Sequence, residues 1–302
     1  RTNTILQSAF FKLADIIPEA QAIELMKAAA KATYGRKGDD VVQKNWAAID
    51  AGAKQVVEVK VPESWKDAED EGLFMAHATH GAQEAQDFVN NIQCKINAQE
   101  GNSLPVSAFT EYVDGTTPSG TAAYEKRGIA VNVPVWQPEN CIQCNRCAYV
   151  CPHAAIRPVA LTEEELAKAP EGTKAIDMIG MPGLKFTMTV SAYDCTGCGS
   201  CANVCPVNNA GKKAPALVMT SFDDETAKEQ EKYDYLVQLA EKQEVLDKFK
   251  ISTVKGSQFR KPYLEFSGAC AGCGETPYAK LVTQLFGDRM YIANATGCSS
   301  IW

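Results

Sequence analysis

Positive charge, long apolar runs and histidine are all scarce in this sequence of 302 residues. The 30 Lys and Arg residues are outnumbered by 37 Asp and Glu, which gives a net charge of −7. Because contacts to phosphates need clustered positive charge, we expect no nucleic-acid partner. No apolar run approaches the roughly 18 residues of a membrane helix, and no signal peptide is visible, so we expect no membrane partner either.

Cysteine is nearly absent from the first 140 residues, which contain only Cys94, although the sequence has 12 cysteines. A secreted disulfide scaffold would be shorter and its cysteines more evenly spread, so the crowding in the second half favours metal ligands. Cys94 falls off the apolar stripe of its predicted helix, and we interpret it as a structural cysteine. His77 and His80 lack a suitably spaced carboxylate or cysteine, and we interpret them as ordinary polar residues.

The spacing of apolar residues and the positions of Gly and Pro predict the secondary structure outside the cysteine-rich part. The length alone suggests about two domains. Gly35 is expected to end the first of these helices in the left-handed conformation, and Thr276 to cap the last. The expected elements are helices over 18–35, 40–54, 82–98, 223–249 (broken once) and 276–287, strands over 56–61 and 290–293, and a loop over 101–128.

One cysteine phrase, Cys-x2-Cys-x2-Cys-x3-Cys-Pro, occurs twice, beginning at Cys141 and at Cys195. This is the spacing of bacterial two-cluster ferredoxins, in which three thiolates hold one [4Fe–4S] cube and the fourth holds the other. Zinc sites use separated Cys pairs or Cys with His, so zinc and disulfides are disfavoured alternatives. The motif predicts two ligand sets: Cys141, Cys144, Cys147 and Cys205 for the first, and Cys195, Cys198, Cys201 and Cys151 for the second.

The segment 152–194 between the two runs is longer than a minimal ferredoxin needs. Thr162 with Glu165 predicts a capped helix there, and residues 185–190 predict a strand. We therefore expect a ferredoxin-like domain with an insert, packed within a larger protein. Two such clusters pass single electrons and do no bond chemistry themselves.

A third set, Cys270-x2-Cys273-x24-Cys298, supplies three thiolates, one fewer than a cube or a tetrahedral zinc ion requires. Cys94 or a residue beyond Trp302 is a source for the fourth ligand. The glycines around Cys270 and Cys273 let the backbone approach a cluster or cofactor closely. An iron–sulfur cluster is the favoured reading, with zinc as the open alternative.

Four phrases together resemble pyruvate:ferredoxin (flavodoxin) oxidoreductase, a family of thiamine-diphosphate enzymes. They are the ferredoxin pair, the Tyr-Glu-Lys-Arg-Gly phrase at 124–128, the stretch 267–278 around Cys270, and the stretch 293–302 around Cys298. The resemblance covers essentially the full chain and implies an internal piece of a longer polypeptide, cut at Arg1 and Trp302. The implied fold is an α+β multidomain fragment, in which partial α/β domains flank a ferredoxin-like domain with an insert. The implied domains are 1–62, the end of a γ-type domain that contacts coenzyme A; 63–134, an EKR-type linker; 135–217, the two-cluster domain; and 218–302, a connecting helix and the start of a domain that binds thiamine diphosphate.

The resemblance also implies roles for individual residues. Cys270, Cys273 and Cys298 would hold a third [4Fe–4S] cluster, with the fourth ligand beyond the chain end. Glu275 and Cys298 would lie against thiamine diphosphate, and Asn3 and Asn45 would approach coenzyme A. No catalytic residue is implied within the segment, since the groups that activate the cofactor, bind its Mg²⁺ and hold pyruvate lie elsewhere in the family's polypeptide.

The implied activity is oxidative decarboxylation of pyruvate with coenzyme A to acetyl-CoA and CO2. Electrons would pass singly from thiamine diphosphate through three clusters to ferredoxin or flavodoxin. The implied partners are that carrier and the remainder of the same polypeptide, in a homodimer located in the cytoplasm or in an organelle such as a hydrogenosome. A sibling 2-oxoacid:ferredoxin oxidoreductase and a stand-alone polyferredoxin are the open alternatives.

Overall fold

The computed structural model describes residues 2–68, 78, 81–211 and 214–300, and the chain divides into two compact units at residues 72 and 73. The first unit consists of α1 (Thr2–Ala14), α2 (Glu19–Tyr34) and α3 (Asp39–Lys54). The second unit contains the helices α4 (Gln83–Phe88), α5 (Cys94–Asn97), α6 (Arg146–Val150), α7 (Glu163–Ala167), α8 (Ser200–Asn203), α9 (Pro206–Ala210), α10 (Asp224–Leu236), α11 (Gln243–Lys248), α12 (Val254–Ser257) and α13 (Thr276–Phe286). Its strands are β1 (Asn132–Trp136), β2 (Ile156–Leu161), β3 (Ile176–Asp177), β4 (Lys185–Val190) and β5 (Leu217–Ser221). Within the described ranges, no helix has the length and apolar character needed to cross a membrane.

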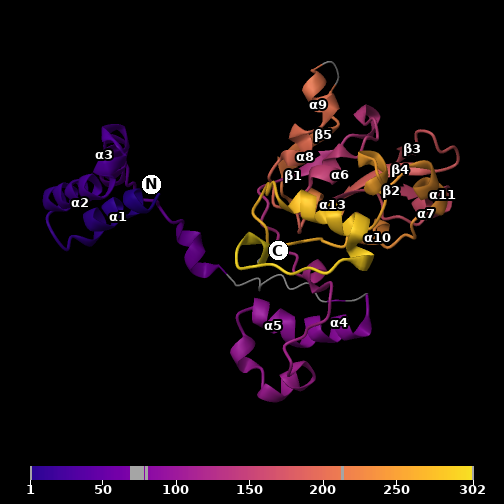
Figure 1. Ribbon diagram of the computed structural model, residues 1–302, viewed down its shortest axis with the longest axis horizontal. Coiled ribbons are helices and arrows are strands. Elements are labelled where there is room, and N and C mark those ends of the chain that lie inside the picture. The colour runs from indigo at the N-terminus through magenta and orange to yellow at the C-terminus, as the bar shows by residue number, and fades with distance from the viewer. Residues whose placement is uncertain (1, 69–77, 79–80, 212–213, 301–302) are drawn as a thin grey trace. The chain divides into compact units, whose positions relative to one another are not determined.

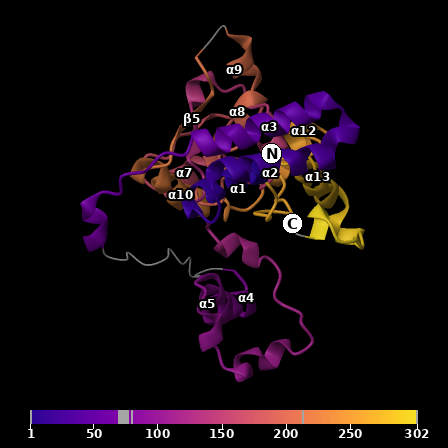
Figure 2. The same ribbon diagram turned by 90° about the vertical axis from the view of Figure 1, so that its left-hand side faces the viewer.

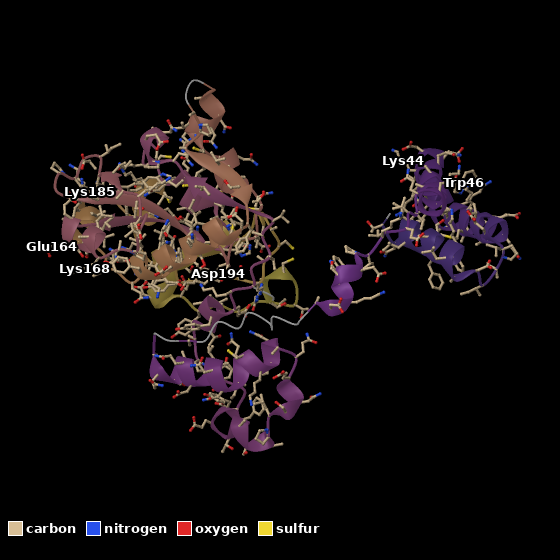
Figure 3. The ribbon with its side chains drawn as sticks, turned by 180° about the vertical axis from the view of Figure 1, so that it is seen from behind. Lys44, Trp46, Glu164, Lys168, Lys185 and Asp194 are labelled. Atoms are coloured by element: carbon tan, nitrogen blue, oxygen red, sulfur yellow. The ribbon has the colours of Figure 1, made fainter. Side chains whose placement is uncertain are left out.

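The three helices of the first unit pack closely because small residues line their contacts (Figure 2). A Cβ on Gly52 of α3 would lie 2.3 Å from the carbonyl oxygen of Ile5 on α1. Ser8 of α1 donates a hydrogen bond of 2.6 Å to the carbonyl of Ile49 on α3. Trp46, labelled in Figure 3, donates its indole N–H to the carbonyl of Lys27 on α2.

Two antiparallel sheets form the centre of the second unit (Figure 1). β1 pairs with β5, and β4 lies between β2 and β3. Phe186 of β4 is completely buried, and its ring makes edge contacts with Trp136 at 6.0 Å and Phe259 at 6.4 Å between centroids. Cysteines of both runs pack against this same apolar core: Cys141, Cys147, Cys151 and Cys201.

Several predicted elements are confirmed. Thr162 and Glu165 form a reciprocal capping box at the start of α7, and β4 has the predicted bounds. The charged stretch 223–249 forms α10 and α11 with one break between them. The helix predicted over 82–98 runs through α4 and α5 with a π-helical turn between them, and Cys94 is buried there beside Val89 and Ala78.

The strands predicted over 56–61 and 290–293 are wrong. A strand needs a partner for its backbone groups, and neither segment has one among the described residues. Val57 and Val59 are accordingly 77% and 78% exposed, and Tyr291 is fully exposed. Local sequence patterns predicted these strands, but tertiary pairing decides whether they form.

Two predicted helix ends are also wrong. Gly35 has a right-handed φ of −55° and the chain continues into a 3-10 turn, so the left-handed residue is Gly38, with φ of 101°. Thr276 is the first residue of α13, and Glu275 occupies the cap position before it. The left-handed glycine lies three residues after the predicted one, and the cap of α13 lies one residue before the predicted one.

We predict that Gly52→Ala lowers the free energy of unfolding by about 1–3 kcal/mol, because the added Cβ pushes α3 away from α1. Gly35→Ala is the matched control, since no atom lies within 4 Å of its Cβ position and its φ suits alanine. Thermal unfolding followed by circular dichroism compares the two variants. Equal melting temperatures would contradict the close approach at Gly52.

Candidate metal centres

The eight cysteines of the two runs form two groups, and the last cysteine of each run lies with the other run. Burial raises the pKa of the Cys141 thiol, and the nearby Cys144 and Cys205 raise it further. Burial likewise raises the pKa of Cys195 to about 12, with further contributions from Cys151 and Cys198. The structure therefore brings Cys205 to the first run and Cys151 to the second.

We call these the first group (Cys141, Cys144, Cys147 and Cys205) and the second group (Cys195, Cys198, Cys201 and Cys151). The groups are neighbours. Burial raises the pKa of Cys147 well above its usual value, and the largest further contribution comes from Cys201. A charge on one group is therefore felt by the other.

The chemistry of these groups fits iron–sulfur clusters. Burial raises the pKa of Cys201 to about 12, and the neighbouring Cys151 raises it further. Thiolates crowded together out of water are unfavourable unless bound cations offset their charge, and metal binding supplies that offset. No three His, Cys, Asp or Glu side chains of the described ranges surround one point as ligands of a single ion.

The two loops have the same backbone shape. The N–H of Gln143 donates to the sulfur of Cys141, and the N–H of Gly197 donates to the sulfur of Cys195, both at 3.4 Å. Gln143 and Gly197 occupy equivalent positions and have left-handed φ angles of 53° and 68°. Backbone amides aimed at sulfur reduce the cost of negative charge on it.

Left-handed glutamine and asparagine in the first loop are held by their own side chains. Gln143 is 1% exposed; its amide donates to the carbonyl of Asp177 and accepts from the N–H of Ile179, both at 2.8 Å. Asn145, at φ of 59°, donates to the carbonyl of Lys255 at 2.9 Å. These bonds tie the first loop to the segments around β3 and α12. The sequence analysis missed both residues, although aligning the two runs places them opposite Gly197 and Gly199.

Lys280 is a second feature that the sequence analysis missed. It lies on α13, is 1% exposed, and donates to the carbonyls of Ala148 at 2.6 Å and Cys151 at 3.0 Å. Burial lowers its pKa to about 8, so the ammonium group still carries its charge at pH 7. It satisfies carbonyls at the end of α6, where cations are favourable. The available signal was a lysine between Ala279 and Leu281 on a helix with an apolar stripe.

The loop of Cys270 and Cys273 lies beside the second group. A Cβ on Gly272 would lie 3.3 Å from the Cβ of Cys198. The hydroxyl and then the amide of Thr276, at the start of α13, lower the pKa of the Cys273 thiol. The contacts with Thr276 thus favour the ionised form of Cys273.

The other residues predicted for this part of the chain are more dispersed. Cys270 is exposed, Glu275 is exposed at the cap of α13, and Cys298 is exposed in a 3-10 turn. No hydrogen bond joins Cys298 to Cys270 or Cys273 in the described part of the chain. The structure thus brings the loop of Cys270 and Cys273 next to the second group.

The two asparagines of the first unit have different surroundings. Asn3 is exposed on α1, whereas Asn45 is 5% exposed and donates its side-chain amide to the carbonyl of Val41. Of the pair, Asn3 presents its side chain at the surface of this unit. His77 and His80 lie outside the described residues.

Residues 140–209 match the family model of the 4Fe-4S dicluster domain, and residues 76–130 match the EKR model, described as a domain of unknown function. The chain thus contains a two-cluster ferredoxin domain within a mixed helix-and-sheet fold.

Full-length comparison confirms the resemblance to pyruvate:ferredoxin (flavodoxin) oxidoreductase. The whole chain aligns with the pyruvate:ferredoxin oxidoreductase of Moorella thermoacetica at 55% identity, over 25% of that protein's length. It also aligns with the pyruvate-flavodoxin oxidoreductase of Enterobacter agglomerans at 53% identity, over 24% of that protein's length. It is 45% identical to 16% of the pyruvate dehydrogenase [NADP(+)] of Cryptosporidium parvum. The chain spans a quarter or less of the length of these curated relatives.

We predict that Gly197→Ala lowers the iron content by about four per chain, the content of one cube. Its Cβ would lie 2.9 Å from the carbonyl oxygen of Asn132, so the loop of the second group must shift. Gly199→Ala is the matched control, since it has a similar φ of 73° with no atom within 4 Å of its Cβ position. Iron and acid-labile sulfide assays on both variants test this. Equal iron loss would mean that left-handed strain, and not the contact with Asn132, sets the requirement for glycine.

Proposed function

We propose that this chain is the electron-transfer segment of a pyruvate:ferredoxin (flavodoxin) oxidoreductase. The observation that carries the proposal is the position of the last cysteine of each run. Cys151 of the first run lies with the second run, and Cys205 of the second run lies with the first, inside a domain that matches the dicluster model. When bound, [4Fe–4S] clusters accept and release one electron at a time. The chain's own residues set where those electrons can go.

The contacts between cysteine groups support an order of transfer. Gly272, in the loop of Cys270 and Cys273, adjoins Cys198 of the second group. Cys201 of the second group acts on Cys147 of the first. The route would run from the third loop through the second group to the first. Ile142, in the loop of the first group, is 50% exposed and is a place where an external carrier could approach.

The remaining cofactors and partners belong to the whole polypeptide. We propose thiamine diphosphate with Mg²⁺, coenzyme A and pyruvate as its ligands, and a homodimer as its assembly. Glu275 and Cys298 are assigned to thiamine diphosphate, with Cys298, Cys270 and Cys273 assigned to a third cluster. The exposure of Glu275 and Cys298 is compatible with contacts to parts of that polypeptide outside this chain. For coenzyme A, surface exposure favours Asn3 over Asn45.

We propose four domains in this chain: a coenzyme A-contacting part over 1–62, a linker over 63–134, the two-cluster part over 135–217 and the start of the cofactor domain over 218–302. We propose ferredoxin or flavodoxin as the electron acceptor. The relatives' names specify ferredoxin, flavodoxin or NADP(+) as acceptor, yet all match the whole chain.

Anaerobic reconstitution of the 302-residue chain is expected to give about eight irons and eight sulfides, from two cubes. Cys147→Ala should remove about four of these irons. Cys94→Ala is the control. Cys94 packs beside Val89 in a separate group of buried apolar side chains, so the iron content of this variant should equal that of the wild type. Two zinc ions with no acid-labile sulfide would overturn the assignment.

In the full-length enzyme, Cys147→Ala should interrupt electron delivery to ferredoxin or flavodoxin, while the release of CO2 in a single turnover of pyruvate still occurs. The reason is that Cys147 belongs to the first group, at the far end of the proposed route from the third loop. Rates of carrier reduction and of CO2 release, measured together, separate the two steps. Loss of CO2 release with an intact fold would contradict the electron-transfer role. Turnover with 2-oxobutyrate and 2-oxoglutarate beside pyruvate tests the substrate.

A further inference from the structure

The Glu-Lys-Arg phrase at 125–127 lies in the region that matches a domain of unknown function. Its three charged side chains have different surroundings. Glu125 and Arg127 pair with each other and remain 30% and 49% exposed. Lys126 points inward, with its ammonium nitrogen 2.5 Å from a carboxylate oxygen of Asp194, and these two side chains are only 11% and 4% exposed.

Asp194 is the residue immediately before Cys195, the first cysteine of the second group (Figure 3). Its carboxylate also accepts a hydrogen bond from Ser191, at 2.5 Å. The N–H of Cys195 donates to the carbonyl of Ser191, which closes a short turn around Asp194. Asp194 is thus part of the structure that aims Cys195.

The backbone of the phrase holds the same turn from the other side. The N–H of Gly128 donates to the carbonyl of Tyr193 at 2.8 Å, and a Cβ on Gly128 would lie 3.2 Å from the Tyr193 ring. Lys126 has a left-handed φ of 41°, which is rare for a residue with a side chain. Such a conformation persists where surrounding contacts fix it, and here it directs the side chain to Asp194.

The other charged side chains near Lys126 make contacts of their own. Arg157 forms an ion pair with Glu265, and Asp234 accepts from Gln230. The Lys126 ammonium also lies 4.9 Å from the centre of the Phe266 ring, four residues before Cys270. Lys126 is therefore the cation in direct contact with Asp194, in a buried position between the second group and the chain that leads to the third loop.

We propose that Lys126 is a positioning residue for the second group, which neutralises Asp194 beside the cluster and fixes the turn that presents Cys195. This proposal rests on the proposed function, since it requires a cluster on the second group. Reduction adds one electron, and hence one negative charge, to a buried cluster. An uncompensated carboxylate nearby opposes that charge and lowers the reduction potential. The region of unknown function thereby acts on electron transfer through one lysine.

The test measures the midpoint potential of each cluster by redox titration followed by electron paramagnetic resonance, in the intact protein that carries this chain. In Lys126→Met, which keeps the aliphatic stem, the reduced-to-oxidised ratio of one cluster should fall about tenfold at a fixed solution potential, equivalent to about 59 mV for one electron. Asp194→Asn should shift the same cluster in the opposite direction. The double variant should return close to the wild-type potential, and Lys126→Arg should restore most of it. Arg127→Gln, which removes the exposed cation next to Lys126 in sequence, should leave all potentials unchanged.

Iron and sulfide contents, measured on every variant, separate the possible failures. Wild-type protein without clusters would overturn the proposed function and this inference with it. Unchanged potentials in Lys126→Met and Asp194→Asn, with full iron content, would overturn the inference alone. If Lys126→Met loses iron, the double variant decides: retained iron supports charge compensation, because neither charge is then left alone. Equal iron loss in both would overturn it, since the pair would then be needed only for folding.

Discussion

The close grouping of eight cysteines, two of them buried and six partly buried, is the constraint on which the rest of the second unit depends. Four of them, Cys141, Cys147, Cys151 and Cys201, pack in the core that contains Phe186 and Trp136. Burial raises the pKa of Cys195 and Cys201 to about 12. Neutral thiols would gain little from being crowded together in this way. If the cysteines are metal ligands, they must ionise, and bound cations make that ionisation favourable. Backbone N–H groups that donate to sulfur and the left-handed turns that aim them follow from this requirement.

Segments far apart in the sequence contribute to the two loops. Gln143 is held by the backbone at Asp177 and Ile179, and Asn145 by the carbonyl of Lys255. Lys280 reaches from α13 to the carbonyl of Cys151, and Lys126 reaches from the region that matches the EKR model to Asp194. Each bond is buried or partly buried, and each connects a neighbouring segment to a residue in or next to a cysteine run. The spacing between the groups is thereby fixed by the whole unit, and electron transfer depends strongly on that spacing.

How far the sequence predicted this arrangement depends on the range of the interactions. Local patterns succeeded: Thr162 and Glu165 cap α7, and alternation located β4, because both depend on residues a few positions apart. The cysteine spacing predicted two groups, because three thiolates spaced as Cys-x2-Cys-x2-Cys on one loop hold the same cluster. The strands expected over 56–61 and 290–293 failed because pairing is a tertiary property. Lys126 was missed for the same reason, because its contact with Asp194 is tertiary. Lys280 lies between Ala279 and Leu281 on an apolar stripe, but the carbonyl groups that it contacts are likewise distant in the sequence.

The two cysteine runs have nearly the same sequence spacing but different electrostatic surroundings. The first loop adjoins Lys255, whose pKa is lowered by burial and raised by Cys144 and Cys141. The second loop follows Asp194, a buried carboxylate that requires Lys126 as its partner. Clusters with the same ligands differ in potential when the charges around them differ. A repeated motif in unlike surroundings can therefore give electron flow a direction, which two identical sites would lack.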